Sequence, residues 1–181
     1  KKAYFHRFED SEDGISPRTI PGVKNGMFLS TGLEHNVFGK PAEGQADRVM
    51  EMEKRHRKFK AVPSAIKPFY VTHEDTDTDL LLVGVTSTNG ALEEAVEELE
   101  AEGKKVNHLQ LRLLAPFPTE ALRPYVEGAK KVLIVEEDLT AQLRELFAIH
   151  FDCHDKMLSL LQYDGTPFTT STIVNKAKEV F

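Results

Sequence analysis

The pattern of hydrophobic and polar positions changes near residue 75 of the 181-residue chain. Before that point, glycines and prolines interrupt a polar stretch that is too irregular to enclose a core of its own. One surface helix is predicted there, over 45–60, because apolar residues and one histidine recur three and four positions apart among charged neighbours. Those recurring positions are Val49, Met52, His56 and Phe59. Residues 61–78 are then expected to form a linker or an edge segment.

After residue 79, short apolar runs alternate with amphipathic helical patterns, which favours right-handed crossovers and a mostly parallel sheet with helices on both faces. We therefore predict an open three-layer α/β/α domain, whose ligands would lie at the carboxyl ends of its strands. The predicted strands are 80–85, 106–111, 132–135 and 157–161. The predicted helices are 91–102 after a cap at Thr88 or Asn89, 119–127, 140–151, and a terminal helix after a cap at Thr170 or Ser171.

Composition and charge narrow the class of protein. The chain carries a formal charge of −6, which disfavours nucleic acid and anionic membranes as partners. No apolar run approaches the length of a membrane span and no signal peptide is evident, so a cytoplasmic location is expected. A single cysteine, Cys153, excludes an internal disulfide and an ordinary iron-sulfur cluster within this chain. The chain begins at Lys1 without methionine, which suggests a fragment.

The loop after the first predicted strand is a candidate anion site. Thr86, Ser87 and Thr88 lie just ahead of a helix, where free backbone N–H groups can bind an anion. The segment is neither GxGxxG nor a P-loop, so simple capping of the helix by a tight turn is the favoured alternative.

Two further clusters are weaker candidates. Three acids follow the strand at 132–135, where they could bind a metal or transfer protons, although acids ahead of a helix more often complement its dipole. Two histidines flank the single cysteine without a fourth zinc ligand. We therefore assign no metal site and no catalytic residue to this chain. The acids are Glu136, Glu137 and Asp138, and the other cluster is His150, Cys153 and His154.

In the irregular first segment, an arginine lies between two prolines that restrict the backbone. In EDGISPRTIPG, residues 12–22, two prolines and two glycines surround Arg18, whose guanidinium suits bidentate contacts to a carboxylate or phosphate. The alternative is an internal salt bridge to Glu12 or Asp13. His35 could donate a proton to a ligand or merely tie backbone together.

Several motifs keep their order along nearly the whole chain, and together they resemble the C-terminal part of the α subunit of 2-oxoacid:ferredoxin oxidoreductases. One departure is Ala141, which stands where that family usually has the glycine of GQL. The motifs are residues 4–8 with EDGISPRTIPG, TGLEHNVFG at 31–39, MEKRHRKF at 52–59, LRLLAPFP at 111–118, VLIVEED at 132–138, AQL at 141–143 and YDGTPF at 163–168.

This resemblance implies a fold and a set of partners. Residues 65–181 would form a five-stranded, transketolase C-terminal-like domain with an antiparallel edge strand at 69–72. Residues 1–64 would form an irregular arm and a helix that link it to a missing thiamine-diphosphate-binding domain. The family enzyme uses thiamine diphosphate, Mg²⁺ and an iron-sulfur cluster to convert a 2-oxoacid such as 2-oxoglutarate to an acyl-CoA while reducing ferredoxin. The implied partners are the N-terminal domain, the β subunit, ferredoxin, the 2-oxoacid and CoA.

The expected role of this fragment is subunit assembly and active-site closure. It would bind no cofactor and be inactive alone, because no stretch supplies the pyrophosphate, Mg²⁺ and glutamate sites of thiamine chemistry. Ser16, Arg18 and His35 are the candidates to face the substrate or CoA. Two alternatives are a free-standing α/β module that binds a small anion at residues 86–90 and the C-terminal domain of a transketolase or pyruvate dehydrogenase relative.

Overall fold

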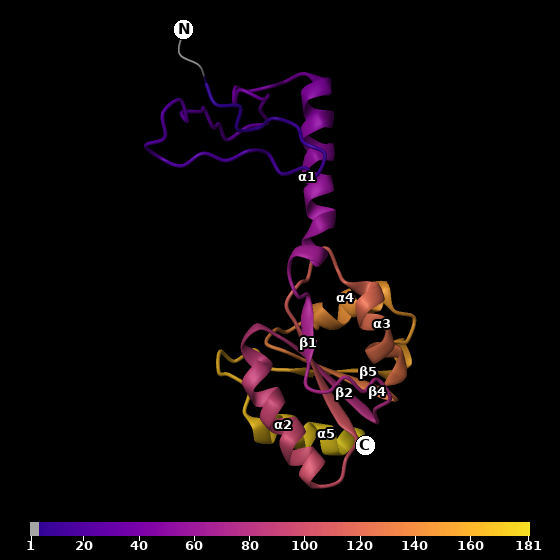
Figure 1. Ribbon diagram of the computed structural model, residues 1–181. Coiled ribbons are helices and arrows are strands. Elements are labelled where there is room, and N and C mark those ends of the chain that lie inside the picture. The colour runs from indigo at the N-terminus through magenta and orange to yellow at the C-terminus, as the bar shows by residue number, and fades with distance from the viewer. Residues whose placement is uncertain (1–3) are drawn as a thin grey trace. The chain divides into compact units, whose positions relative to one another are not determined.

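The computed structural model describes residues 4–181, and the chain divides into two compact units at Ile66 and Lys67. We call residues 4–66 the arm unit and Lys67–Phe181 the sheet domain. Within the arm unit, the irregular residues 4–44 ahead of its helix are called the arm. The arm unit contains irregular segments and one long helix, α1 (Gln45–Ala65). The strands of the sheet domain, all but β3 labelled in Figure 1, are β1 (Phe69–Val71), β2 (Leu80–Val85), β3 (Val106–Leu111), β4 (Lys131–Glu136) and β5 (Met157–Leu161). The helices of the sheet domain are α2 (Asn89–Ala101), α3 (Thr119–Gly128), α4 (Gln142–His150) and α5 (Thr170–Val180), with 3₁₀ turns η1 (Thr86–Thr88) and η2 (His154–Lys156).

The five strands form one sheet in the order β1-β3-β2-β4-β5. All neighbours are parallel except β1, which runs antiparallel to β3 with Phe69 opposite Leu111. The predicted mostly parallel sheet and its antiparallel edge strand are therefore confirmed. Because β3 and β4 lie on opposite sides of β2, the topological switch point falls between the carboxyl ends of β2 and β4.

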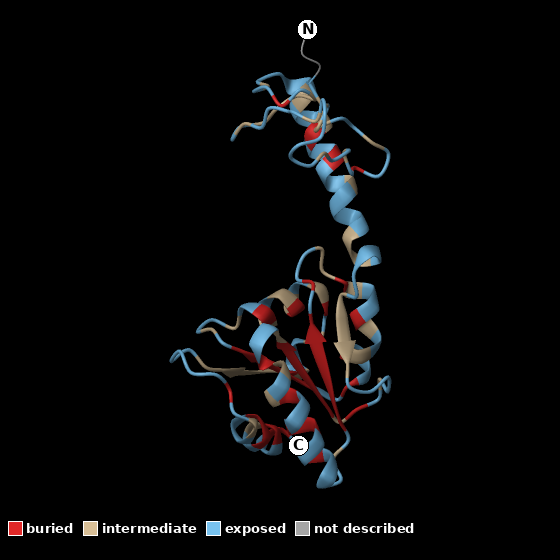
Figure 2. Ribbon diagram, turned by 60° about the vertical axis from the view of Figure 1, so that its left-hand side comes forward, coloured by how far each residue is buried: buried red, intermediate tan, exposed pale blue. Residues whose placement is uncertain are grey.

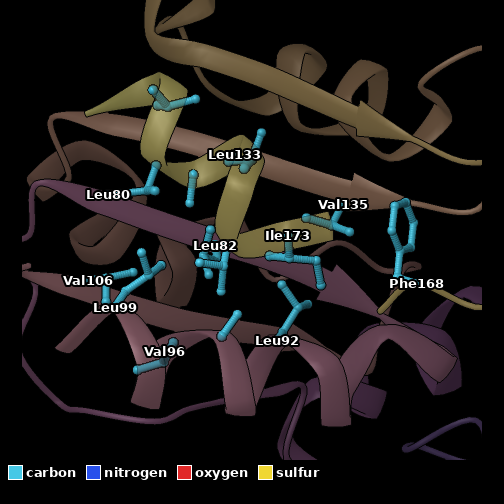
Figure 3. Packing of buried hydrophobic residues seen from close by; sticks show 14 residues of the cluster. Leu80, Leu82, Leu92, Val96, Leu99, Val106, Leu133, Val135, Phe168 and Ile173 are labelled. Carbon is cyan, nitrogen blue, oxygen red and sulfur yellow. The ribbon is translucent and has the colours of Figure 1, made fainter. Parts of the chain in front are cut away.

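Helices cover both faces of the sheet because the central strands are apolar on both sides. Leu80 and Leu82 of β2 point to one face, where they pack with α2 and α5. Figure 3 shows this packing, with Leu92 and Val96 of α2 and Ile173 of α5 against the strand side chains. Leu81 and Val83 point to the other face, against residues of α3 and α4 such as Leu122 and Phe147. This two-sided burial confirms the predicted three layers.

Several predicted boundaries were wrong by one to five residues. The first helix continues through residues 61–65, because Pro63 lies in the last turn and removes only one helical hydrogen bond. Helix α2 begins at Asn89, and Thr88 makes no side-chain cap bond to it. Helix α4 spans only Gln142–His150, and Pro118 occupies the N-cap position of α3. The cap of α5 is Thr169, whose hydroxyl accepts a hydrogen bond from Thr172 N, and not Thr170 or Ser171.

The arm unit has almost nothing buried, as Figure 2 shows by its pale blue and tan ribbon. Its buried residues are two glycines and two charged side chains, Glu51 and Lys54 of α1. The predicted apolar stripe of α1 is exposed instead, with 56% of Val49 and 51% of Met52 accessible to solvent. Within residues 4–66, no apolar side chain is buried, so this unit has no hydrophobic core of its own.

Candidate functional site

The segment that carries EDGISPRTIPG packs closely on α1 at Gly14. Gly14 is buried and has a φ of 75°, in the left-handed region that side chains other than glycine rarely adopt. A Cβ atom at this position would collide with the carbonyl oxygen of Lys54 and the amide nitrogen of Lys58. The glycine therefore allows the arm to lie directly against one face of the helix.

Hydrogen bonds then fix the backbone that leads to Arg18. The Asp13 carboxylate accepts a hydrogen bond from Ile15 N at 2.9 Å, and this bond lowers the pKa of Asp13. The Ser16 hydroxyl donates to Glu9 O at 2.8 Å, which ties the two ends of the turn together. Arg18 follows this turn, and its flanking prolines restrict the backbone there.

Lys54 of α1 binds the arm through a hydrogen bond and also forms a buried ion pair within the helix. Lys54 Nζ donates hydrogen bonds to Phe8 O at 2.7 Å and to Glu51 Oε1 at 2.8 Å. Only 5% of the Lys54 side chain and 2% of the Glu51 side chain are exposed. Each charge therefore depends on the other, because an unpaired buried charge is strongly unfavourable.

A cleft of about 340 Å³ lies between the arm and α1, and we call it the arm cleft. It brings together all three residues that the sequence predicts to face a ligand, since Ser16, Arg18 and His35 all line it. Within residues 4–181, Arg18 makes no salt bridge, so the alternative pairing with Glu12 or Asp13 is not formed.

Sequence reasoning missed four cations of this cleft. It is also lined by Arg7, Lys54, Arg55 and Lys58, which in the sequence resemble ordinary solvated charges. The helical spacing of Lys54 and Lys58, one turn apart, was the available signal that they share a face. What the sequence did not indicate is that the arm covers this face.

His35 lies against the ring of Phe8, with 3.6 Å between the ring centroids. Its Nδ1 atom is buried and has no hydrogen-bond partner within the described residues. The adjacent Glu34 receives two hydrogen bonds from Arg55, at 3.0 and 2.7 Å, and this guanidinium lowers the pKa of Glu34 to about 2. The Glu34–Arg55 pair therefore anchors the His35 loop to α1.

The structure also brings Glu34, His35 and Glu51 close enough to share a metal ion. Both carboxylates are already compensated, Glu34 by Arg55 and Glu51 by Lys54. These neighbouring cations would repel a divalent metal, so the group fits a network of ion pairs better than a metal centre.

After β2, two of the three hydroxyl groups proposed for anion binding already make hydrogen bonds within the protein. Thr88 Oγ1 bonds both the amide and the carbonyl of Val85, and Ser87 Oγ donates to Glu137 at 2.7 Å. Thr86 and Thr88 line a hollow with the acids that follow β4, whose charges oppose an anion. Anion binding there stays a prediction, and the geometry favours the alternative of a tight turn.

The acids after β4 cap the next helix. Glu136 Oε2 accepts a hydrogen bond from Leu143 N at 2.6 Å, and Asp138 Oδ1 accepts one from Thr140 N at 2.8 Å. Glu136 and Asp138 therefore lie where they complement the dipole of α4, whereas the third acid, Glu137, accepts a hydrogen bond from Ser87 instead.

Ala141, the departure from GQL, occupies the residue before α4 with a φ of 58°. This left-handed conformation costs a residue other than glycine about 1–2 kcal/mol. The structure thus supplies a backbone reason for a glycine at this position, and the fold tolerates the alanine.

Burial raises the pKa of Glu136 to about 7, with a further contribution from its hydrogen bond to Asp138. The stabilisation from the protonated form is full below pH 4.5, and it is lost as pH rises through 7. We expect the free energy of unfolding to fall by about 1–3 kcal/mol from this group between pH 5 and 8.

The control is Glu136→Gln, which keeps a similar shape and removes the titration. Denaturant unfolding of both proteins across pH 5–8 isolates the contribution of Glu136 from that of other groups, among them the buried His108. A pH dependence that is identical in the two proteins would contradict the assignment.

Comparison with known proteins places this geometry in a family. The sequence model of pyruvate:ferredoxin oxidoreductase core domain II matches residues 78–170, half of the chain, within the sheet domain. The chain belongs to this family. The similarity extends into the arm unit, since the α subunit of 2-oxoacid:ferredoxin oxidoreductase 2 from Aeropyrum pernix is 34% identical over 180 residues. The α subunit from Saccharolobus solfataricus is 30% identical over 178 residues. These matches cover 98% and 96% of this chain but only 28% and 27% of the relatives, so the chain spans little more than a quarter of their length.

Solved structures of this family and of transketolase agree with the fold. The 2-oxoglutarate:ferredoxin oxidoreductase from Magnetococcus marinus, solved with 2-oxoglutarate, coenzyme A and succinyl-CoA bound, is 31% identical. It superimposes with a TM-score of 0.84 over 98% of this chain, which corresponds to 31% of that chain. A split-gene transketolase matches 64% of this chain and 42% of its own at a TM-score of 0.51 and 19% identity. That likeness shows the fold alone and confirms the predicted transketolase-like domain.

Proposed function

We propose that this chain is part of the α subunit of a 2-oxoacid:ferredoxin oxidoreductase, which converts a 2-oxoacid and CoA to an acyl-CoA and reduces ferredoxin. Its role is to assemble the subunit and to close the active site with the arm unit. The similarity to α subunits along the whole chain supports this proposal, as do the ligands bound in the M. marinus enzyme.

The ligand-facing role is supported mainly by the position of Arg18 in the cleft and by its lack of an acidic partner. Its mount is rigid, it lines a cleft with Ser16 and His35, and within the described residues it has no acidic partner. A guanidinium held in this way is prepared to bind a carboxylate or phosphate. We therefore propose that the arm cleft faces the 2-oxoacid or CoA.

The assembly role rests on the exposed apolar side chains of the arm unit. Ile20, Met27, Leu33 and Val49 are each at least half exposed, and no apolar side chain is buried in residues 4–66. Exposed apolar side chains in a unit that buries none are expected to pack against another part of the protein. We propose that the arm unit packs on other parts of the complex, either the thiamine-binding domain of the same subunit or the β subunit.

The cofactor chemistry belongs to other parts of the complex in this proposal. Thiamine diphosphate with Mg²⁺ requires a pyrophosphate site, metal ligands and a glutamate at the aminopyrimidine. Within the described residues, the one group of three potential metal ligands is occupied by ion pairs with Lys54 and Arg55. The residues present do not fit thiamine diphosphate, and a chain with one cysteine does not fit an iron-sulfur cluster.

Two further parts of the proposal concern location and the alternative function. Among residues 4–181, no helix has both the length and the apolar character needed to cross a bilayer. We place the complex in the cytoplasm. The free-standing anion-binding module is the weaker alternative, because the acids at the sheet edge oppose an anion there.

The experiment that tests the ligand-facing role is Arg18→Ala in the intact complex. We expect the KM for the 2-oxoacid or CoA to rise roughly 10-fold to 100-fold, since a hydrogen bond to a charged group contributes about 1.5–3 kcal/mol. The measurement is the initial rate of 2-oxoacid-dependent ferredoxin reduction at varied substrate concentrations.

Lys24→Ala is the matched control, because Lys24 is an exposed cation of the same arm that does not line the cleft. Its KM values should match those of the unmodified complex. An unchanged KM with a lowered melting temperature in Arg18→Ala would instead assign Arg18 a structural role.

A further inference from the structure

We infer that the arm cleft is a phosphate-binding subsite, in which Lys58 and Arg7 act together with Arg18. This inference rests on the proposed function and names the ligand class of the same cleft. It adds two binding residues that the sequence did not indicate.

The arm cleft keeps an excess of positive charge after its ion pairs are counted. Five side-chain cations line the cleft, and two of them are compensated: Lys54 by Glu51 and Arg55 by Glu34. Arg7, Arg18 and Lys58 have no ion-pair partner within residues 4–181. Three like charges beside one hollow repel each other, and an anion bound among them would relieve that repulsion.

The Arg7 side chain and the backbone ahead of Arg18 are held in place. The close packing of Gly14 on α1 sets the Arg18 segment beside the backbone of Lys58. Arg7 donates a hydrogen bond to Pro17 O at 3.4 Å, and its guanidinium lies over the Phe8 ring, 5.6 Å from the centroid. Because the backbone and Arg7 are already positioned, only the exposed Arg18 and Lys58 side chains would have to be ordered on binding.

The number of unpaired cations favours a phosphate group over a single carboxylate as the ligand of the cleft. One guanidinium satisfies the two oxygens of a carboxylate, whereas a phosphate group offers a double negative charge and three acceptor oxygens. Three cations match the second pattern. The volume of about 340 Å³ is at the lower end of small-ligand sites, so the cleft would enclose only a phosphate-bearing portion of a molecule such as CoA.

The test uses the intact complex with Lys58→Ala and compares three ligands: CoA, dephospho-CoA and the 2-oxoacid. The KM for CoA should rise roughly 10-fold to 100-fold, and the KM for the 2-oxoacid should change less than about twofold. If the 3′-phosphate occupies the cleft, dephospho-CoA already binds poorly and is insensitive to the substitution. If the diphosphate occupies it, both nucleotides respond equally.

Lys60→Ala is the matched control, because Lys60 is an exposed lysine of the same helix that does not line the cleft. Its KM values should remain those of the unmodified complex. Lys58→Arg, which keeps the charge, should recover most of the affinity for CoA.

Two outcomes would overturn the subsite. One is a rise in the KM for the 2-oxoacid alone, which would make the cleft a carboxylate site. The other is unchanged kinetics with a weaker complex, which would mean that an acidic side chain of a neighbouring part fills the cleft.

A direct measurement separates this inference from the proposed function. Inorganic phosphate is titrated into the intact protein and followed by ³¹P line broadening. Binding that is weakened in Lys58→Ala and retained in Lys60→Ala supports the subsite even if no 2-oxoacid is oxidised. Binding that is equal in all three proteins overturns it, whatever the activity of the complex.

Discussion

Replacing Lys54 by methionine is expected to release the arm from α1 within the intact subunit. The substitution leaves Glu51 charged, buried and unpaired, and it removes the hydrogen bond to Phe8 O. Breaking one partner of a buried ion pair costs about 3–5 kcal/mol. Amide hydrogen exchange in residues 8–18 should therefore become roughly 100-fold to 1,000-fold faster, as measured by mass spectrometry.

The double variant Lys54→Met with Glu51→Leu is the informative control. It removes both charges and keeps volume in the buried contact, so exchange should return most of the way to that of the unmodified protein. Because the cleft would lose only compensated charges, the KM for CoA in the double variant should stay close to that of the unmodified complex. Equal exchange in the single and double variants would mean that the hydrogen bond to Phe8, rather than the ion pair, holds the arm.

The sheet domain could be predicted from the sequence because its apolar pattern records burial directly. The run from Leu80 to Val83 is buried on both faces, which only a central parallel strand with two helical layers explains. The ends of the helices were predicted less accurately. A proline in the last turn of α1, or a cap of α5 at Thr169 rather than Thr170, changes only one hydrogen bond. The edge strand β1 has three half-buried residues and was found through the family resemblance instead.

The arm cleft could be predicted only in part, because polar contacts hold it. Arg18 and His35 were noticed through the stiff motif and the loop around them. Lys54 and Lys58 were missed because a lysine in a charged helix normally points into solvent, and nothing in the local sequence indicates that Gly14 lies against it. The stripe of Val49 and Met52 predicted a surface helix but not its charged, buried opposite side.

The two units should differ completely in their ability to fold alone. The sheet domain, residues 67–181, contains both hydrophobic clusters found among residues 4–181, and these enclose side chains such as Phe147 and Leu133 with no exposed area. Expressed alone, it should unfold in a single cooperative transition. Residues 1–66 lack a buried apolar side chain in their described part, 4–66, and should show a gradual, noncooperative loss of helix on heating.

Circular dichroism at 222 nm against temperature, with calorimetry on both pieces, measures this difference. Burial of about 25 cal/mol per Å² of apolar surface drives folding, so a unit that encloses none cannot offset the entropy of ordering its backbone. Addition of the remaining parts of the complex should then restore structure to residues 1–66, because they supply the missing apolar contacts. A cooperative transition in the isolated arm unit would show that its ion pairs suffice, and the assembly role proposed for it would lose its physical basis.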